Sequence, residues 1–147
     1  MKHRGRMNKF KTTVDINETQ RVAKIIGANL KEFNESQVGP YEFKPFTIHI
    51  TNDSEDIIGG LTGDIFDKIC LFQLLWVHEN ERQKGLGTEL FKKLEEFARN
   101  NGCEIIQLKT AEFQAKQFYE KMGFTVVATL PNSFKGYTGY FMRMNLI

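Results

Sequence analysis

The feature that most constrains this chain is a polar loop between an apolar strand and an amphipathic helix. The stretch from Leu74 to Ala98 reads LLWVHENERQKGLGTELFKKLEEFA, with glycines at positions 85 and 87. The first N–H groups of a helix lack internal partners and carry partial positive charge. Glycine lets an anion approach the backbone closely. The loop therefore indicates an anion-binding turn, flanked by the positive side chains of Arg82 and Lys84.

Two common phosphate motifs do not fit this loop. A P-loop needs Lys and then Ser or Thr after its last glycine, but Gly87 is followed directly by Thr88. The dinucleotide fingerprint needs a third glycine where this chain has Leu90. What remains is Arg-x-x-Gly-x-Gly after a strand. For the loop alone, the alternative is a simple strand-to-helix turn whose glycines serve only packing.

Composition limits the classes of protein to which the chain can belong. With 147 residues, 41% of them hydrophobic and 26% charged, one packed domain is expected over residues 10–147. Residues 1–9 would form a flexible arm, and Met7 is an alternative native start. The net charge of +2 is too small to predict nucleic-acid binding. No apolar run is long enough to cross a membrane, and because no apolar segment follows the basic residues 1–10, we expect no secretory signal there.

Cysteine and histidine usage predicts neither a disulfide framework nor a metal site. Cys70 and Cys103 have no metal-ligand spacing, and each lies at the edge of an apolar run. We expect small buried thiols and a reducing, cytoplasmic location. The three histidines are too far apart in the sequence to suggest a shared metal.

Hydrophobic periodicity predicts the order of helices and strands. Strands are expected over residues 10–16, 46–51, 57–65, 70–77, 104–109, 124–129 and 139–146, and a loop over residues 131–136. Helices are expected after Asn17, where Gln20 completes a capping box, over residues 86–98, and over residues 114–122. Hairpins make most neighbours antiparallel, while the strand–helix–strand step after Leu74 implies a right-handed parallel crossover. The continuous apolar run over residues 70–77 predicts a strand buried on both faces.

A second motif, C-terminal to the glycine-containing loop, makes a function for that loop more specific. Ala115 to Phe124 reads AKQFYEKMGF, and it follows the loop after a strand-sized gap. The two motifs in this order resemble the Gcn5-related N-acetyltransferase (GNAT) superfamily, at motif level from Leu71 to Phe124 and in element order along the whole chain. The resemblance implies an α+β fold: a mixed, mostly antiparallel sheet of six to seven strands, flanked by about four helices in three α/β/α layers.

The resemblance also implies acetyl-CoA as co-substrate and no metal. The pantetheine arm would lie between the strand ending at Val77 and the strand over residues 105–108, bonding to the backbone of Val77 as an extra strand does. The N–H groups of residues 83–88 would hold the pyrophosphate. The implied cofactor-binding residues are Leu75, Trp76, Val77, Arg82, Gln83, Lys84, Gly85, Leu86, Gly87, Thr88, Ala115, Phe118, Tyr119 and Lys121.

The implied reaction is transfer of acetyl to a primary amine by direct attack in a ternary complex. Tyr119 is the implied general acid, since a phenol with a pKa of about 10 can protonate a departing thiolate. The alternative is that Tyr119 is an aromatic core residue. The base stays open between Glu79 and His78, with Glu81 and Asp64 also suitable by type.

Several functional questions stay open at this level. A non-catalytic acyl-CoA-binding regulatory module on the same fold is the alternative to an enzyme. Transfer to a hydroxyl acceptor is a further alternative. The acceptor, a small amine or a peptide amine, is not identified, although the helix after Asn17, residues 59–67 and residues 131–137 would line its pocket. Aromatic residues near the C-terminus would form either a homodimer contact or core: Phe134, Tyr137, Tyr140 and Phe141.

Overall fold

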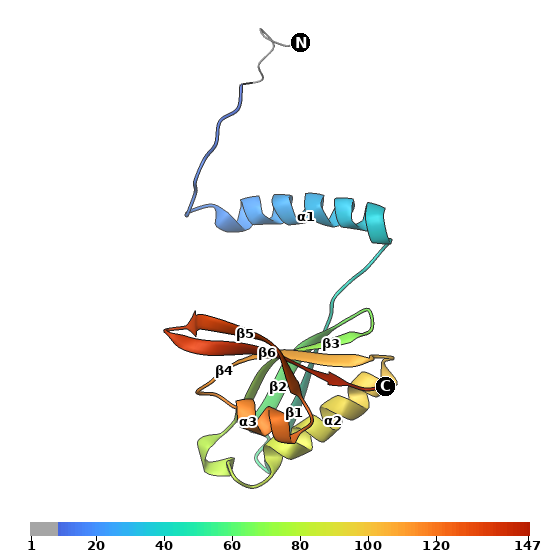
Figure 1. Cartoon of the computed structure of the whole chain (residues 1–147), viewed down its shortest axis with the longest axis vertical. Coiled ribbons are helices and arrows are strands. Elements are labelled where there is room, and N and C mark those ends of the chain that lie inside the picture. The colour runs from blue at the N-terminus through green and yellow to red at the C-terminus, as the bar shows by residue number, and fades with distance from the viewer. Residues whose placement is uncertain (1–8) are drawn as a thin grey trace. The chain divides into compact units, whose positions relative to one another are not determined.

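The structure, a computed structural model, describes residues 9–147, which form two units that divide after Pro40 (Figure 1). The predicted arm therefore lies outside the described residues, apart from Lys9. Helix α1 (Thr19–Val38) belongs to the first unit. The second unit, residues 41–147, contains a six-stranded sheet, two further α-helices and a short 3-10 turn.

Two predictions for the first unit are wrong. Residues 10–16 alternate apolar and polar side chains but form no strand. A strand needs a neighbouring strand to bond with, and none of the strands in the described residues pairs with this segment. Nor does Asn17 cap the helix. The Asp15 carboxylate instead accepts the N–H groups of Asn17 and Glu18, at 2.8 and 3.2 Å, and forms the turn before α1. The helix itself is confirmed, and its apolar stripe, which includes Ile26 and Phe33, is exposed.

The sheet confirms the mixed, mostly antiparallel architecture. Its strands are β1 (Lys44–Thr51), β2 (Ile57–Phe66), β3 (Ile69–Val77), β4 (Ile105–Ala111), β5 (Thr125–Phe134) and β6 (Tyr137–Asn145), in the order β1-β2-β3-β4-β6-β5. Every neighbouring pair is antiparallel except β3 and β4, which are parallel and joined through a helix. This pair is the predicted crossover.

The two helices of the second unit lie on one face of the sheet (Figure 1). Helix α2 (Leu86–Asn100) buries Leu90, Phe91, Leu94 and Ala98. Helix α3 (Lys116–Lys121) is shorter and buries Tyr119. The Phe91 ring lies 5.5 Å from the Tyr119 ring and 5.3 Å from the Phe72 ring of β3, so one core joins both helices to the sheet. Each such buried side chain contributes roughly 1.5–3 kcal/mol to the free energy of unfolding. The predicted three-layer α/β/α arrangement, with helices on both faces of the sheet, stays a prediction.

The strands β3 and β4 diverge part-way along their length. They pair only from Ile69 to Leu71, opposite residues 105–107. Immediately afterwards the register between β2 and β3 shifts, and Gln73 becomes an extra residue with no partner on β2. A bulge of this kind bends a strand and increases its local twist. The second half of β3 therefore separates from β4 and leaves a cleft between them.

The prediction that β3 is buried on both faces is wrong beyond this bulge. Leu74 and Trp76 are 67% and 47% exposed, whereas Leu75 and Val77 pack against the core. Alternate residues of a strand point to opposite faces, and α2 and α3 cover only one of these. A run of apolar residues alone does not show which face is covered.

The predicted loop over residues 131–136 is mostly strand. β5 continues to Phe134, which pairs with Tyr137 across a two-residue turn. Lys135 and Gly136 have positive φ angles of 49° and 90°, the geometry that a tight hairpin requires. Pro131 lies within an irregular stretch where the register shifts, so its missing N–H removes no regular sheet bond.

Candidate active site

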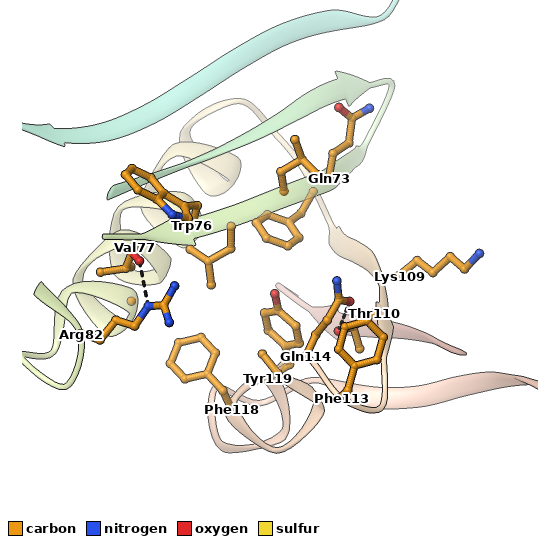
Figure 2. Close-up of a pocket in the computed structure, with 15 residues that line it drawn as sticks. Gln73, Trp76, Val77, Arg82, Lys109, Thr110, Phe113, Gln114, Phe118 and Tyr119 are labelled. Atoms are coloured by element: carbon orange, nitrogen blue, oxygen red, sulfur yellow. Dashed lines mark hydrogen bonds between the residues drawn. The ribbon is translucent and has the colours of Figure 1, made fainter. Parts of the chain in front are cut away.

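A cavity of about 820 Å³ occupies the cleft between the diverging strands (Figure 2). One wall is β3 from Phe72 to Val77, and the opposite wall comes from Lys109 and Thr110 of β4. The start of α2 and the segment leading into α3 also line it. The bulge at Gln73 thus creates the cavity, because it ends the pairing that would otherwise fill this space.

The cavity brings together eight of the residues predicted to bind the cofactor, namely Leu75, Trp76, Val77, Arg82, Gly87, Ala115, Phe118 and Tyr119. An adjoining cavity of about 240 Å³ adds Gln83, Gly85, Leu86 and Thr88. Lys84 lines neither cavity, and its Nζ lies 2.9 Å from a carboxylate oxygen of Glu81. Lys121 lines a different hollow along α3, together with Lys116.

The backbone of β3 offers hydrogen-bonding groups to the cavity. His78 donates its N–H to the Ile58 carbonyl at 2.8 Å, and Val77 is paired with Gly59. In an antiparallel ladder this places Val77 in a non-hydrogen-bonded pair, so its N–H and C=O point away from β2. The same alternation applies to Leu75, which is paired with Leu61. Both residues therefore present backbone groups on the side where β4 has separated.

The loop before α2 has the geometry of an anion-binding turn. Gln83 and Gly85 have φ angles of 64° and 79°, and Gly85 is the N-cap of the helix. The Glu89 N–H donates to the Gly85 carbonyl at 3.0 Å, so the N–H groups of residues 86–88 precede the first helical bond. A Cβ atom at Gly87 would lie 3.3 Å from the Phe118 ring, so a larger residue here would require that ring to shift.

Arg82 lies where the loop meets the end of β3. Its Nε donates to the Val77 carbonyl at 3.0 Å, as the dashed line in Figure 2 shows. Among the described residues no carboxylate forms an ion pair with it, whereas nearby Lys84 is paired. The rest of the guanidinium thus supplies positive charge beside the free N–H groups of α2.

Tyr119 is both a core residue and part of the cavity wall. Its side chain is 5% exposed and lies among the rings of Phe72, Phe91 and Phe124. Its hydroxyl points into the cavity (Figure 2). Burial raises the pKa of Tyr119 to about 12, because the phenolate would lose its hydration. The hydroxyl is therefore fully protonated at neutral pH.

The proposed bases do not line this cavity. The His78 Nδ1 accepts the Asn80 N–H at 3.1 Å and so caps the 3-10 turn η1 (Glu79–Glu81), the first residue of which is Glu79. Asp64 accepts a hydrogen bond from Gln73 at 2.8 Å. Within the part of the chain that the structure describes, the cavity lining contains no carboxylate and no imidazole.

Comparison with known proteins identifies the family. The model of the acetyltransferase (GNAT) family matches residues 16–124. The chain belongs to the GNAT acetyltransferase family. A blasticidin-S acetyltransferase of Streptomyces morookaense is 31% identical over 109 residues, which cover 71% of this chain and 80% of the relative. An acetyltransferase of Agrobacterium fabrum is 33% identical over 107 residues, covering 73% and 78%.

The fold agrees with this assignment. The crystal structure of an acetyltransferase from Bacillus cereus superimposes with a TM-score of 0.80 at 26% identity, covering 90% of this chain and 97% of that one. GNAT acetyltransferases use acetyl-CoA, so this chain is an acetyltransferase with acetyl-CoA as its co-substrate. Within residues 9–147, no cluster of His, Cys, Asp and Glu side chains could hold a metal ion. None of the described helices is long and apolar enough to span a membrane.

The cavity of this GNAT acetyltransferase includes residues that the sequence motifs did not mark: Gln73, Lys109, Thr110, Phe113 and Gln114. The Gln114 side-chain carbonyl accepts the Ala111 N–H at 2.8 Å and contacts the Thr110 hydroxyl at 3.2 Å, which joins the end of β4 to the start of α3. Position in the topology was the only available signal, since Gln73 lies in β3 and the other four residues lie where β4 leads into the second motif.

Proposed function

We propose that the protein transfers an acetyl group from acetyl-CoA to a primary amine of a small molecule by direct attack. The observation that carries the proposal is one continuous cleft. At one end it has an anion-binding turn with Arg82, which forms no ion pair within residues 9–147; backbone groups of β3 lie along its side, and a buried tyrosine hydroxyl lies in its wall.

The chain's own groups fit the pyrophosphate and the pantetheine arm of acetyl-CoA. The N–H groups of residues 86–88 and the guanidinium of Arg82 would hold the pyrophosphate. The outward-facing backbone groups of Leu75 and Val77 would bond to the pantetheine amides as a neighbouring strand does. When bound, acetyl-CoA supplies the activated acetyl group as a thioester. Lys121, in a different hollow, would reach at most an outer phosphate.

In the reaction, the amine nitrogen bonds to the carbonyl carbon while the carbon–sulfur bond breaks. The amine loses a proton and the sulfur gains one. Tyr119 would donate its hydroxyl hydrogen to the departing sulfur. The pKa of about 12 keeps this hydrogen on the Tyr119 oxygen at neutral pH. The same pKa opposes complete transfer to a thiolate whose own pKa is about 8.5, so part of the contribution is hydrogen-bond stabilisation of the negative sulfur.

The base is the least determined part of the proposal. His78 and Glu79 lie at the end of β3, outside the cavity lining, and would act through water. Asp64 is connected to the cavity through Gln73. A water chain that opens to solvent would serve equally, because the cavity itself holds no described carboxylate or imidazole.

The acceptor proposal draws on the relatives as well as on the site. One relative is named for blasticidin S, an antibiotic. We therefore include antibiotics that carry a free amine among the candidate acceptors, beside simpler amines. A cytoplasmic location is part of the same proposal, since both cysteines are free thiols.

The test is a screen for acetyl-CoA-dependent release of free thiol over amines, amino acids, antibiotics and peptide N-termini, with the acetylated product identified by mass. Transfer to at least one amine is expected. Tight binding of acetyl-CoA without transfer to any amine would instead favour a regulatory acyl-CoA-binding module. Products acetylated on oxygen would redirect the proposal to hydroxyl acceptors.

A further inference from the structure

Three aromatic side chains form an exposed cluster that the acetyl-transfer chemistry does not use. The Phe113 ring lies 5.3 Å from the Phe134 ring and 4.8 Å from the Tyr137 ring. The three side chains, which we call the aromatic trio, are 49%, 54% and 47% exposed. Large contiguous exposed apolar patches mark binding sites, so a cluster of three exposed rings is a candidate for one.

The aromatic trio is continuous with the cavity. Phe113 itself lines the cavity of about 820 Å³. A side cavity of about 180 Å³ contains Phe134 and Ser133, and it shares Lys109, Thr110 and Gln114 with the main one. In Figure 2, Arg82 and Phe113 lie on opposite sides of Tyr119. The trio therefore lies at the end of the cavity that is remote from the anion-binding turn, where an acceptor would enter.

The surrounding structure holds the trio in place. The Glu112 N–H donates to the Thr138 carbonyl at 2.9 Å, and the Glu112 carboxylate accepts the Thr138 N–H at 3.1 Å. These two bonds fix the segment that carries Phe113 to the hairpin that carries Tyr137. At Gly139, a Cβ atom would lie 2.5 Å from the Ser133 hydroxyl oxygen, so β5 lies directly against β6 beside Phe134. Preorganised rings bind a ligand at a lower entropic cost.

The charge of the cavity narrows the class of acceptor. Its charged lining residues are the cations Arg82 and Lys109, and none of the described lining residues is acidic. A polycation such as a polyamine or an aminoglycoside would find no carboxylate in this lining; Asp64 and Glu112 lie outside it, and each accepts a hydrogen bond from a neighbouring residue. Aromatic rings, by contrast, bind planar faces in offset or edge-to-face contacts.

We propose that the acceptor is a monoamine carried on a planar aromatic ring, and that the aromatic trio binds this ring. The proposal rests on the proposed acetyl transfer and specifies its acceptor. The ring lies against Phe113 and Tyr137, and the amine extends toward Tyr119.

The experiment compares three acceptors under saturating acetyl-CoA: 2-phenylethylamine, 2-cyclohexylethylamine of similar size without a planar ring, and spermidine. We expect kcat/KM for 2-phenylethylamine to exceed that for 2-cyclohexylethylamine by roughly three- to tenfold, from the contribution of ring–ring contacts. Spermidine should be the poorest acceptor. Calorimetry with CoA present should show the same order in amine binding, independently of turnover.

Variants then assign the selectivity to the trio. Phe113→Leu and Tyr137→Leu keep an apolar side chain but remove a ring, and both should bring the phenyl-to-cyclohexyl ratio close to one. Phe43→Leu is the matched control, since Phe43 is also about half exposed but stacks on Phe66 outside the cavity. It should keep the wild-type ratio. Stabilisation of each variant by CoA checks that its cofactor site is intact.

Equal use of the phenyl and cyclohexyl amines, or a preference for spermidine, would overturn the ring proposal while leaving acetyl transfer intact. Failure to acetylate any amine would overturn both proposals. If Tyr137→Leu changed the oligomeric state but not the acceptor ratio, the trio would be a contact between copies of the chain, and the ring proposal would be wrong.

Discussion

At the scale of single residues, Tyr119 fits both of its predicted roles, the general acid and the aromatic core residue. Its ring packs in the core, and its hydroxyl points into the cavity. Tyr119→Phe keeps the ring, so the fold and the affinity for acetyl-CoA should change little. If the hydroxyl assists the departing sulfur, turnover should fall by roughly a hundred- to ten-thousand-fold. Steady-state kinetics with a saturating amine, together with calorimetry for acetyl-CoA, measures both quantities.

The control for this variant is Tyr140→Phe. Tyr140 is partly buried and contacts Lys116, but it does not line the cavity. It should keep wild-type turnover. Normal turnover in a folded Tyr119→Phe protein, with chemistry shown to be rate-limiting, would leave Tyr119 as a packing residue only.

Cys70 predicts a specific dependence of stability on pH. Its side chain is 0% exposed, and burial, with a smaller contribution from Cys103, raises its pKa from 9.0 to about 12. The unfolded chain loses this proton at lower pH than the folded chain does. The free energy of unfolding should therefore hold below pH 9 and fall between pH 9 and 12, by about 1.4 kcal/mol per pH unit for this group.

Denaturant unfolding at several pH values, compared between the wild-type protein and Cys70→Ala, isolates this contribution. The variant will be less stable overall because it leaves a small cavity, so the slopes with pH are compared rather than the absolute values. Parallel slopes for the two proteins from pH 9 to 12 would show that the thiol is not kept neutral by burial.

At the scale of elements, the turn between β3 and α2 carries the prediction for cofactor binding. A Cβ atom at Gly85 would meet nothing within 4 Å, so a side chain there would project into open space beside the helix N-terminus. Gly85→Asp should abolish binding of CoA, because the carboxylate occupies the place of the phosphates and repels them. Thermal stabilisation by CoA is the measurement.

Gly102→Asp provides the matched control for backbone strain. Gly102 has a φ of 75°, close to the 79° of Gly85, and is likewise in open space, but it follows the other end of α2. Both variants experience the same left-handed strain, and only Gly85→Asp should lose the response to CoA. If both variants lost the thermal stabilisation by CoA equally, the cause would be backbone strain on folding. A normal response to CoA in Gly85→Asp would mean that the turn does not hold the phosphates.

The elements also show what sequence patterns can and cannot predict. The loop from Arg82 to Gly87, the amphipathic stripe of α2 and the helix of Tyr119 were predictable, because each depends on local periodicity and turn chemistry. The strand predicted over residues 10–16 was wrong, since a strand needs a partner that its own pattern does not reveal. The bulge at Gln73 and the cavity residues Lys109 and Thr110 depend on pairing between distant strands, so no local motif marks them.

At the scale of the whole molecule, the expected homodimer stays a prediction. Of the four aromatic residues proposed for its contact, Phe134 and Tyr137 are exposed, whereas Tyr140 and Phe141 are partly buried. The lysines 116 and 109 lie over these last two rings, which limits their part in any contact. Light scattering over a range of concentrations should show a dimer, and a monomer at every concentration would remove the prediction.

The central claim is that one cleft binds acetyl-CoA at the turn before α2 and transfers its acetyl group beside Tyr119. The most direct test measures acetyl-CoA affinity and amine acetylation in the same samples of wild type, Gly85→Asp and Tyr119→Phe. We predict that Gly85→Asp loses both binding and transfer, whereas Tyr119→Phe retains binding and loses most of its transfer rate. Acetyl-CoA bound with wild-type affinity by Gly85→Asp, or undiminished transfer by both variants, would contradict the claim.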